Sequence, residues 1–445
     1  MVTTARARSC RWRGVALGLT VVLVLTGCVE KIEDSAASGG GGTTPPAAGS
    51  TDDLVVEQFA GERMSFGVIP STPVVATGEP IVVGMINQEN TPLGSFPELR
   101  LGVEAAVDLI NEELGGVGGR PIELVTCITT FSVEQSQACA QQMVQRGAIA
   151  VVGGIDITSN GSIPVLEANQ LPYIGGIPIN FDEMRSPISF QFSGGAPGAF
   201  VAFAEYAART QGATRVAIAY GEYQSIELAA VQFGAGTLRK LGVTDVVEIP
   251  FPITTTDFLP VLTKANESNP DAIFLGAADT ACAPAMKTAH DLGIEAKIYL
   301  VGSCAAPGIA DQVGEEAVAG RIFNVEGPVS SGDREAQLYF ATVARYGDPA
   351  LQAASAATVS FRGAMNLYAL LDELGPDRMS SRDLLALVRD ARNRPSFNGH
   401  SYTCDGEQVP DLPALCAPQQ ILVERRGDAL AALTDWIDVP AIVSS

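Results

Sequence analysis

Small polar side chains follow a buried strand in the stretch 151–164, which reads VVGGIDITSNGSIP. An apolar run ends in two glycines, and Thr158, Ser159, Asn160 and Ser162 come soon after it. This pattern is typical of a strand that delivers a polar loop to a ligand at its carboxyl end. Hydroxyl and free backbone N–H groups there can hold a carboxylate or an amide without any change of charge.

The sequence does not continue this loop into a catalytic motif. A phosphate-binding loop needs GxxxxGK[ST] or GxGxxG, and a hydrolase elbow needs GxSxG. His290 falls in an expected helix and His400 in a turn. Asp156 and Asp279 each follow a strand, where they could form an acid pair across a cleft, contact a ligand or a hinge, or be solvated loop residues. We therefore expect a binding protein and no enzyme, with neither a cofactor nor a metal.

The first 27 residues have the order of features found in a lipoprotein signal peptide. A basic head with four arginines precedes the apolar run 14–26, which is too short to span a bilayer comfortably. The run ends in LTGC, which resembles the lipobox of bacterial lipoproteins. The resemblance implies cleavage before Cys28 and attachment of lipid to its sulfur. An ordinary secretory signal with an incidental cysteine is the alternative.

Residues 28–51 are predicted to be a disordered tether. Within them, 35–50 (SAASGGGGTTPPAAGS) offers no core-forming residue except alanine. Segment 52–79 contains several large apolar residues, and its place in the fold is left open: Leu54, Val55, Val56, Phe59, Phe66 and Val68.

The chain is acidic, with 28 Lys+Arg against 50 Asp+Glu and a formal net charge of −22. Because the signal peptide holds four of the basic residues and no acidic ones, the mature chain is more acidic still. Such a charge argues against nucleic acid as a partner and against adsorption to anionic lipid. The membrane is therefore expected to hold the protein through the lipid on Cys28.

Six cysteines lie downstream of Cys28, and an even number in an exported chain suggests disulfides. Of about fifteen possible pairings, the one that joins sequence neighbours is expected: Cys127–Cys139, Cys282–Cys304 and Cys404–Cys416. A metal site is the weaker interpretation, because the sequence has no CxxC pair and only two histidines.

From residue 80 onward, apolar runs of strand length alternate with amphipathic segments of helix length. This alternation predicts parallel sheets covered by helices on both faces, in two units joined near 191–198 because one core seldom holds so much chain. Strands are expected at 81–86, 123–127, 148–154, 171–176, 215–220, 245–251, 271–276, 297–302 and 321–329. Helices are expected at 99–114, 133–146, 163–169, 198–211, 226–241, 257–268, 283–292, 334–346, 353–374 and 381–391.

The order of these segments resembles the leucine/isoleucine/valine-type solute-binding proteins of ABC importers. The resemblance covers roughly 80–374 and lies in PIVVGMINQENTPLG, INEELGGVGGRPIELVTC, SQACAQQMVQRGAIAVVGG, LEANQLPYIGG, TDFLPVLTKANESNPDAIFLGAADTACAPAMKTAHDLGI and VGEEAVAGRIFNVEGP. It implies the type I periplasmic-binding fold, an α/β fold of two Rossmann-like lobes with parallel sheets joined by hinge crossovers. Lobe 1 is expected at 80–194 plus 330–396, and lobe 2 at 195–329 plus 397–440.

The same resemblance implies that loops after the strands of both lobes line a ligand cleft. The residues that it places there are Asn90, Phe96, Thr158, Ser159, Ile177, Ile179, Tyr223, Ser225, Asp279 and Ser303. In amino-acid binders an acidic residue that pairs with the ligand's amino group falls near Ser303, and here it is absent. The ligand is therefore expected to be small, with an acceptor group and a substantial apolar part.

The resemblance thus predicts a solute-binding lipoprotein that closes on a small molecule and delivers it to ABC permease subunits. The solute is expected to be amino-acid-like or a more apolar carboxylate or amide. We expect a monomer, outside the cytoplasm and anchored to the cell membrane. A sensory lipoprotein that reports ligand binding to a membrane partner is the alternative.

Overall fold

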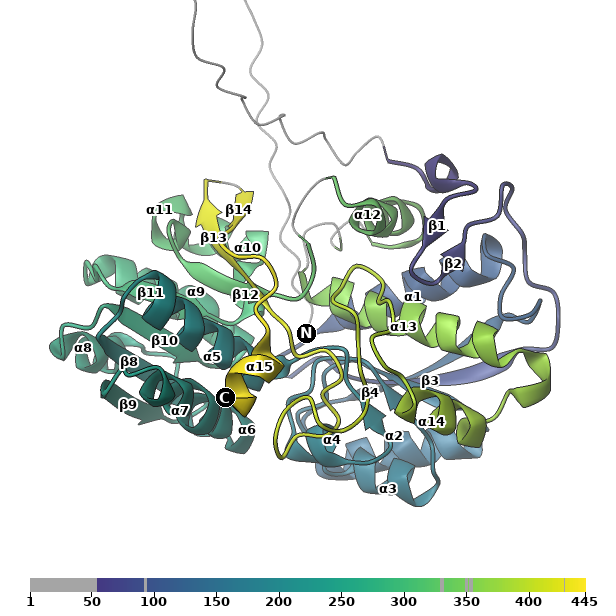
Figure 1. Ribbon diagram of the computed structural model, residues 1–445, viewed down its shortest axis with the longest axis horizontal. Coiled ribbons are helices and arrows are strands. Elements are labelled where there is room, and N and C mark those ends of the chain that lie inside the picture. Colours follow the sequence, from purple (N-terminus) through teal and green to yellow (C-terminus); the bar gives the residue numbers. More distant parts are fainter. Residues whose placement is uncertain (1–53, 92–93, 329–331, 349–350, 352–354, 428) are drawn as a thin grey trace, which may run out of the picture. The chain divides into compact units, whose positions relative to one another are not determined.

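A computed structural model describes residues 54–445, except 92–93, 329–331, 349–350, 352–354 and 428. The expected signal peptide, tether and Cys28 lie outside these residues. The chain forms an α/β fold with one parallel five-stranded sheet and one mixed seven-stranded sheet (Figure 1). The α/β class predicted from the sequence is therefore confirmed.

The five-stranded sheet has the order β4-β3-β5-β6-β7, and its strands are all parallel. Its strands are β3 (Ile81–Gln88), β4 (Ile122–Thr129), β5 (Ala150–Gly153), β6 (Tyr173–Ile174) and β7 (Ser189–Phe190). The helices of this part are α1 (Pro97–Glu112), α2 (Val133–Gln145), α3 (Ser162–Ala168), α4 (Phe181–Arg185), α12 (Arg334–Tyr346), α13 (Ser355–Leu374) and α14 (Ser381–Arg389). A single hydrophobic core joins this sheet to α1 and α13.

The seven-stranded sheet has the order β14-β13-β12-β11-β10-β8-β9. Its pairs β12–β13 and β13–β14 are antiparallel. Its strands are β8 (Arg215–Gly221), β9 (Asp245–Phe251), β10 (Ala272–Gly276), β11 (Lys297–Leu300), β12 (Ile322–Val325), β13 (Ile421–Arg426) and β14 (Ala429–Ala432). The helices of this part are α5 (Gly195–Glu205), α6 (Gln224–Leu228), α7 (Gly236–Lys240), α8 (Leu259–Glu267), α9 (Cys282–Asp291), α10 (Pro307–Val313), α11 (Glu315–Val318) and α15 (Val439–Ser444).

Alternate residues of β10 enter two different cores. Ile273 and Leu275 pack with α8 and α9, whereas Ala272 and Phe274 pack with α5 and α7. Because successive side chains of a strand point to opposite faces, these two cores lie on the two faces of the sheet. Burial on both faces explains why β10 reads as an unbroken apolar run.

Segment 54–69, which the sequence left unplaced, packs onto the first core. It contains a 3-10 turn (Val56–Phe59) and the short strands β1 (Arg63–Met64) and β2 (Gly67–Val68). Its side chains Val56, Phe59, Met64, Phe66 and Ile69 are each at most 7% exposed. Its ion pairs to α12, Glu62–Arg334 and Glu57–Arg345, are largely exposed and contribute little. Apolar burial therefore holds the segment.

Residues 397–417 were expected in the second lobe, yet part of them packs with the first core. Phe397, Tyr402, Cys404 and Cys416 belong to the cluster around the five-stranded sheet. The chain enters the other sheet with β13. The segment is mostly irregular, so the sequence shows no periodicity that would assign it to either sheet.

Three disulfides join the expected pairs, Cys127–Cys139, Cys282–Cys304 and Cys404–Cys416. Cys282 begins α9 and Cys304 lies in a 3-10 turn after β11, so this bond joins two loop regions of the seven-stranded sheet.

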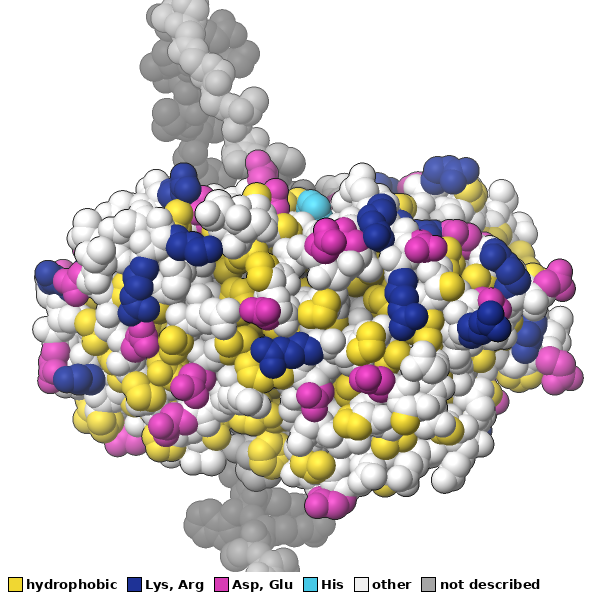
Figure 2. Space-filling model, turned by 60° about the horizontal axis from the view of Figure 1, so that its bottom comes forward, with side chains coloured by type: hydrophobic (Ala, Val, Ile, Leu, Met, Phe, Trp, Pro, Cys, Tyr) yellow, Lys and Arg dark blue, Asp and Glu magenta, His cyan; other side chains and the backbone are white. Residues whose placement is uncertain are grey.

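Basic and acidic side chains are interspersed on the face of the molecule shown in Figure 2.

Candidate functional site

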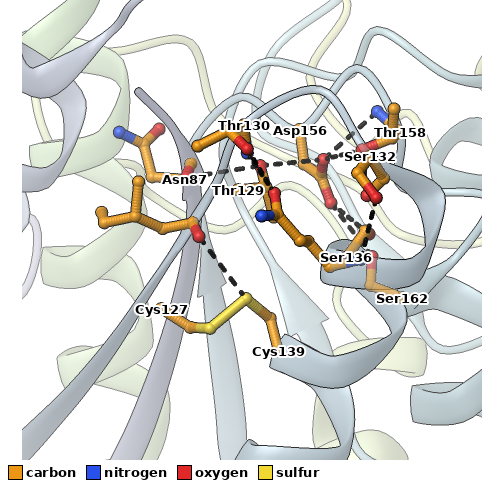
Figure 3. Close-up of a disulfide and its surroundings, with 12 residues drawn as sticks. Asn87, Cys127, Thr129, Thr130, Ser132, Ser136, Cys139, Asp156, Thr158 and Ser162 are labelled. Carbon is orange, nitrogen blue, oxygen red and sulfur yellow. Dashed lines mark hydrogen bonds between the residues drawn. A yellow bond between two sulfur atoms is a disulfide. The ribbon is translucent and has the colours of Figure 1, made fainter. Parts of the chain in front are cut away.

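Asp156, just after β5, is enclosed by hydroxyl groups of its own lobe (Figure 3). Ser136 and Ser162 donate to its Oδ2 at 2.5 and 3.4 Å, and Thr129 and Thr158 donate to its Oδ1 at 3.2 and 2.9 Å. The carboxylate is completely buried. Burial raises its pKa, and the hydrogen bonds from Ser136 and Thr158 oppose that rise only in part. Asp156 therefore organises the polar loop from inside and does not face a ligand.

The hydrogen bonds around Asp156 determine which polar atoms of Thr158 and Ser159 remain available to a ligand. The Thr158 hydroxyl has acceptors at Asp156 and at the Ser132 carbonyl, so its single proton is used within the lobe. The Ser159 backbone N–H donates to the Asp156 carbonyl, but its fully buried Oγ has no partner among the described residues. Of these two expected ligand-binding residues, Ser159 is the one whose side-chain oxygen has no hydrogen-bond partner among the described residues.

Replacing Asp156 with alanine is expected to destabilise the protein by about 3 kcal/mol, because it leaves several buried donors without an acceptor. The matched variant Ser162→Ala removes one hydroxyl, whose proton is shared between Asp156 at 3.4 Å and the Ser159 carbonyl at 3.2 Å, and should cost about 1 kcal/mol. Urea unfolding compares the two variants. Equal destabilisation by both would show that Asp156 does not organise the loop.

The loops that follow β5 and β8 meet each other. The Tyr223 hydroxyl donates to the Ile157 carbonyl at 2.7 Å. This hydrogen bond links the part of the chain built on the five-stranded sheet to the part built on the seven-stranded sheet. Burial, with the charge of Glu183 as the next cause, raises the pKa of Tyr223 to about 12. Beside this bond an open polar pocket of about 380 Å³ is lined by Asn160, Asn180, Phe181, Asp182, Arg185, Tyr223 and Gln224. The sequence predicted only Tyr223 of this set.

The loops that follow β3 and β10 meet as well. A Cβ added to Gly94 would lie 3.1 Å from Asp279 Oδ1 and 2.6 Å from the Phe96 ring, and Gly94 has a φ of +122°. A side chain at residue 94 would therefore be strained and would clash. Phe96 is 8% exposed. The expected cleft residues Phe96 and Asp279 thus lie together.

Glu98 is a residue of this second contact that sequence reasoning missed. Burial raises its pKa to about 7, and the neighbouring charges of Asp279 and Glu89 contribute to the rise. Burial also raises the pKa of Asp279. In the sequence, Glu98 follows a proline at the start of α1, where an acidic residue is expected merely to complement the helix dipole.

The apolar loop after β6 is held by a second buried acid that was missed. Glu183 accepts from the backbone N–H groups of Ile179 and Asn180, at 2.8 and 3.0 Å, and from the Tyr173 hydroxyl at 3.2 Å. Asn180 and Glu183 together form a capping box on α4. The pattern Asn-x-x-Glu is the signal that could have identified it. Ile177 and Ile179 are half-buried against the first core, so each has only part of its surface for a ligand.

The remaining expected site residues, Asn90, Ser225 and Ser303, follow three different strands. Asn90 is exposed, and its backbone N–H bonds to the Ser95 hydroxyl. Ser225 lies buried in α6. Ser303 is half-buried beside Cys304, and the disulfide of Cys304 leads to Cys282, three residues after Asp279. Of these three residues, Asn90 is the one that a hydrogen bond places beside Gly94, through the adjacent Ser95.

Glu326, which follows β12, joins the three chain segments that pass between the sheets. Its Oε1 accepts from the backbone N–H of Gly194 and from the Gln420 amide, at 2.9 and 2.8 Å. Its Oε2 accepts from Arg362 of α13 at 3.1 Å, and Arg362 also bonds to the Phe192 and Glu326 carbonyls. Burial lowers the pKa of Arg362. This buried network lies beside two of the expected crossovers, near 194 and 329, whereas Gln420 lies beyond the third, which was expected near 396.

Among the residues that the structure describes, no group of His, Cys, Asp or Glu could hold a metal ion. In the same part of the chain no helix combines the length and apolarity needed to cross a bilayer.

Comparisons with known proteins agree with this architecture. A family described as periplasmic binding protein matches residues 80–406. No curated protein sequence matches the chain. A leucine-binding protein from Thermotoga maritima is 18% identical, with a TM-score of 0.66 over 80% of this chain and 99% of its own. A solute-binding protein from Rhodopseudomonas palustris, solved with p-hydroxybenzoic acid, is 22% identical, with a TM-score of 0.68 over 81% and 98%. A branched-chain amino acid transporter protein from Streptococcus pneumoniae, solved with isoleucine, is 15% identical, with a TM-score of 0.66 over 81% and 100%.

Proposed function

Because the chain belongs to the periplasmic binding protein family, we propose that it is a lipid-anchored protein that captures a small solute and delivers it to an ABC permease. Members of the family are extracytoplasmic solute-binding proteins of ABC transporters, and the fold is the type I periplasmic-binding fold. The anchoring, the delivery and the choice of solute are the proposed parts. We also propose that it acts as a monomer.

One observation carries the proposal, namely that loops at the carboxyl ends of strands from both sheets touch. The Tyr223–Ile157 hydrogen bond and the Gly94–Asp279 contact join them at two places. Ligands of open α/β sheets bind beyond the carboxyl ends of the strands. A solute bound there contacts both lobes only when they are closed, so it favours closure.

The two lobes are proposed to be the parts built around each sheet, with 80–194 and 330–396 in lobe 1. Residues 195–329 and 421–440 are proposed for lobe 2. Of 397–417, Phe397, Tyr402, Cys404 and Cys416 are reassigned to lobe 1 because they pack in its core, whereas Val409, Leu412 and Leu415 pack in a small cluster with side chains of both parts. The hinge is proposed at the three crossovers that Glu326 joins. An amino-acid-like compound, or a more apolar carboxylate or amide, was the range expected from the sequence, and the acidic groups beside the Gly94–Asp279 contact favour solutes with an amine group within or beside that range.

Mass spectrometry of the protein purified from membranes tests capture directly. Denaturation is expected to release one small molecule, and adding that molecule back should raise the melting temperature of the emptied protein. Release of no solute, with no shift of the melting temperature by amines, amides, carboxylates or amino acids, would contradict the proposal.

Replacing Cys28 with alanine is expected to move the protein out of the membrane fraction or to block its processing. The reason is that a single acyl chain binds a membrane only marginally, whereas two or more hold a protein stably. Fractionation followed by intact-mass measurement checks this expectation. Cys10→Ala, which lies inside the expected signal, is the matched control and should leave anchoring unchanged. Normal cleavage with full membrane retention in the Cys28 variant would refute lipid anchoring.

A further inference from the structure

Buried acceptor atoms without partners gather where the loops after β3 and β10 meet. Asp279 Oδ1 is buried and has no hydrogen-bond partner among the described residues. Gln88 is completely buried, its Nε2 donates to the Gly94 carbonyl at 3.2 Å, and its Oε1 likewise has no partner in the described chain. Gly94 is the residue that Asp279 approaches. A buried acceptor without a donor costs about 1–3 kcal/mol, so this arrangement calls for a molecule that brings donors.

The charges around these acceptors have one sign. Glu98, in the first turn of α1, lies near enough to Asp279 and to Glu89, which follows β3, for their charges to add to the rise of its pKa that burial causes. Burial, and then the charge of Glu98, raises the pKa of Tyr339 of α12. The nearest cation recorded in these contacts, Arg100, already bonds to Glu89 and Glu104. Among the described residues, no cationic side chain contacts Glu98 or Asp279. A carboxylate placed here would meet two acids and no counter-charge.

We propose, on the basis of the solute-binding function above, that this site takes a small solute with an amine group and rejects carboxylates. Glu98 and Asp279 are its specificity-determining residues, one from each lobe, and Gln88 Oε1 accepts a further donor. The ammonium group lies between the two acids when the lobes close, and the apolar part of the solute lies along Phe96. An ammonium group pairs well with carboxylates that are already desolvated, because charge-assisted hydrogen bonds are the strong ones.

The site also predicts how binding depends on pH. The pKa of Glu98 stands at about 7, above its usual 4.5, so much of Glu98 carries a proton below neutrality. A bound ammonium favours the charged carboxylate, and binding therefore releases a proton. Affinity for an amine should rise as pH increases through about 7, whereas affinity for a carboxylate should fall.

Calorimetry with matched probes tests the proposal on the intact protein emptied of solute. Benzylamine, benzamide and benzoate share one ring and differ in charge, and isopentylamine, isovaleramide and isovalerate repeat the comparison with an aliphatic group. Each amine is expected to bind at least about tenfold more tightly than its carboxylate. Buffers of different ionisation enthalpy at about pH 7 should report proton release for the amines.

Glu98→Gln and Asp279→Asn are expected to weaken amine binding by about tenfold to a hundredfold, the range for a lost charge-assisted hydrogen bond. Both should change amide binding little, and Glu98→Gln should abolish the proton release. Glu104→Gln, on the same helix but exposed and paired with Arg100, is the control and should behave like the unchanged protein.

Different results would contradict the amine site and the solute-binding function proposed above. Carboxylates that bind as tightly as the amines, or an anionic solute released from the purified protein, would overturn the amine site and leave solute binding intact. An amine released from the protein, together with lost retention of that amine in Glu98→Gln, would support it even if the six probes are too small to bind. If neither a probe nor a released solute binds, both proposals fail.

Discussion

Replacing Arg362 with methionine is expected to lower the free energy of unfolding by about 3–5 kcal/mol, because it leaves the Glu326 carboxylate buried without its cation. The side chains of Arg362 and Glu326 are 4% and 8% exposed. Arg362 also holds the Phe192 and Glu326 carbonyls, so the variant loses bonds to two crossovers as well. Urea unfolding followed by circular dichroism measures the change.

Lys287→Met is the matched control, since Lys287 and Asp291 form an ion pair with both partners more than half exposed. Such a pair is worth about 0–1 kcal/mol. The double variant Arg362→Met with Glu326→Gln should recover part of the loss, because no charge is then left unpaired. A single Arg362 variant within about 1 kcal/mol of the unchanged protein would show that the network does not support the hinge.

Replacing Glu183 with glutamine is expected to stabilise the protein at pH 8 and to change little near pH 4.5. Burial raises the pKa of Glu183 to about 8 from its usual 4.5. Between these values the folded state keeps a proton that the unfolded state releases, so stability falls as pH rises through this range. The penalty is complete above about pH 8 and is on the order of several kcal/mol.

The glutamine should fit because it reproduces the protonated acid. Its oxygen can accept from the Ile179 and Asn180 N–H groups, and its NH₂ can donate to the Tyr173 hydroxyl. Thermal melts of both proteins across the pH range measure the difference between them, which removes the contribution of every other titrating group. Glu267→Gln, at an exposed residue of α8, is the control. A difference that does not grow between pH 4.5 and pH 8 would contradict the assignment.

The apolar pattern of the sequence predicted the sheets, whereas the polar networks were not predictable from it. The expected strand 245–251 and helix 334–346 have the bounds of β9 and α12, because their periodicity is local. The expected strand 321–329 shortens to Ile322–Val325, since Glu326 turns inward to the crossovers. Its partner Arg362 lies 36 residues away, and no local pattern signals that pair.

The residues of the candidate site were likewise predictable only in part. Asp279 and Phe96 were placed at the cleft by the resemblance to solute-binding proteins, and both lie beside Gly94. The hydroxyls of Thr158 and Ser159 were expected to contact a ligand, yet the Thr158 hydroxyl donates to Asp156, because a buried carboxylate needs nearby donors. Glu98 was not identified, since its pKa is raised mainly by burial and then by the charges of Asp279 and Glu89, and neither its burial nor the approach of Asp279 from the seven-stranded sheet is visible in the local sequence.

The packing of segment 54–69 has a mechanical consequence. A force applied at Leu54 enters the molecule through Phe59, Phe66 and α12, which all belong to the core of the five-stranded sheet. In the hinge motion that we propose, the five-stranded lobe would therefore carry any load applied at residue 54, and the seven-stranded lobe would move relative to it on the three crossovers that Glu326 joins. Such a load would reach neither these crossovers nor the loops that meet at Tyr223 and Asp279, so a proposed amino-terminal anchor would not oppose closure.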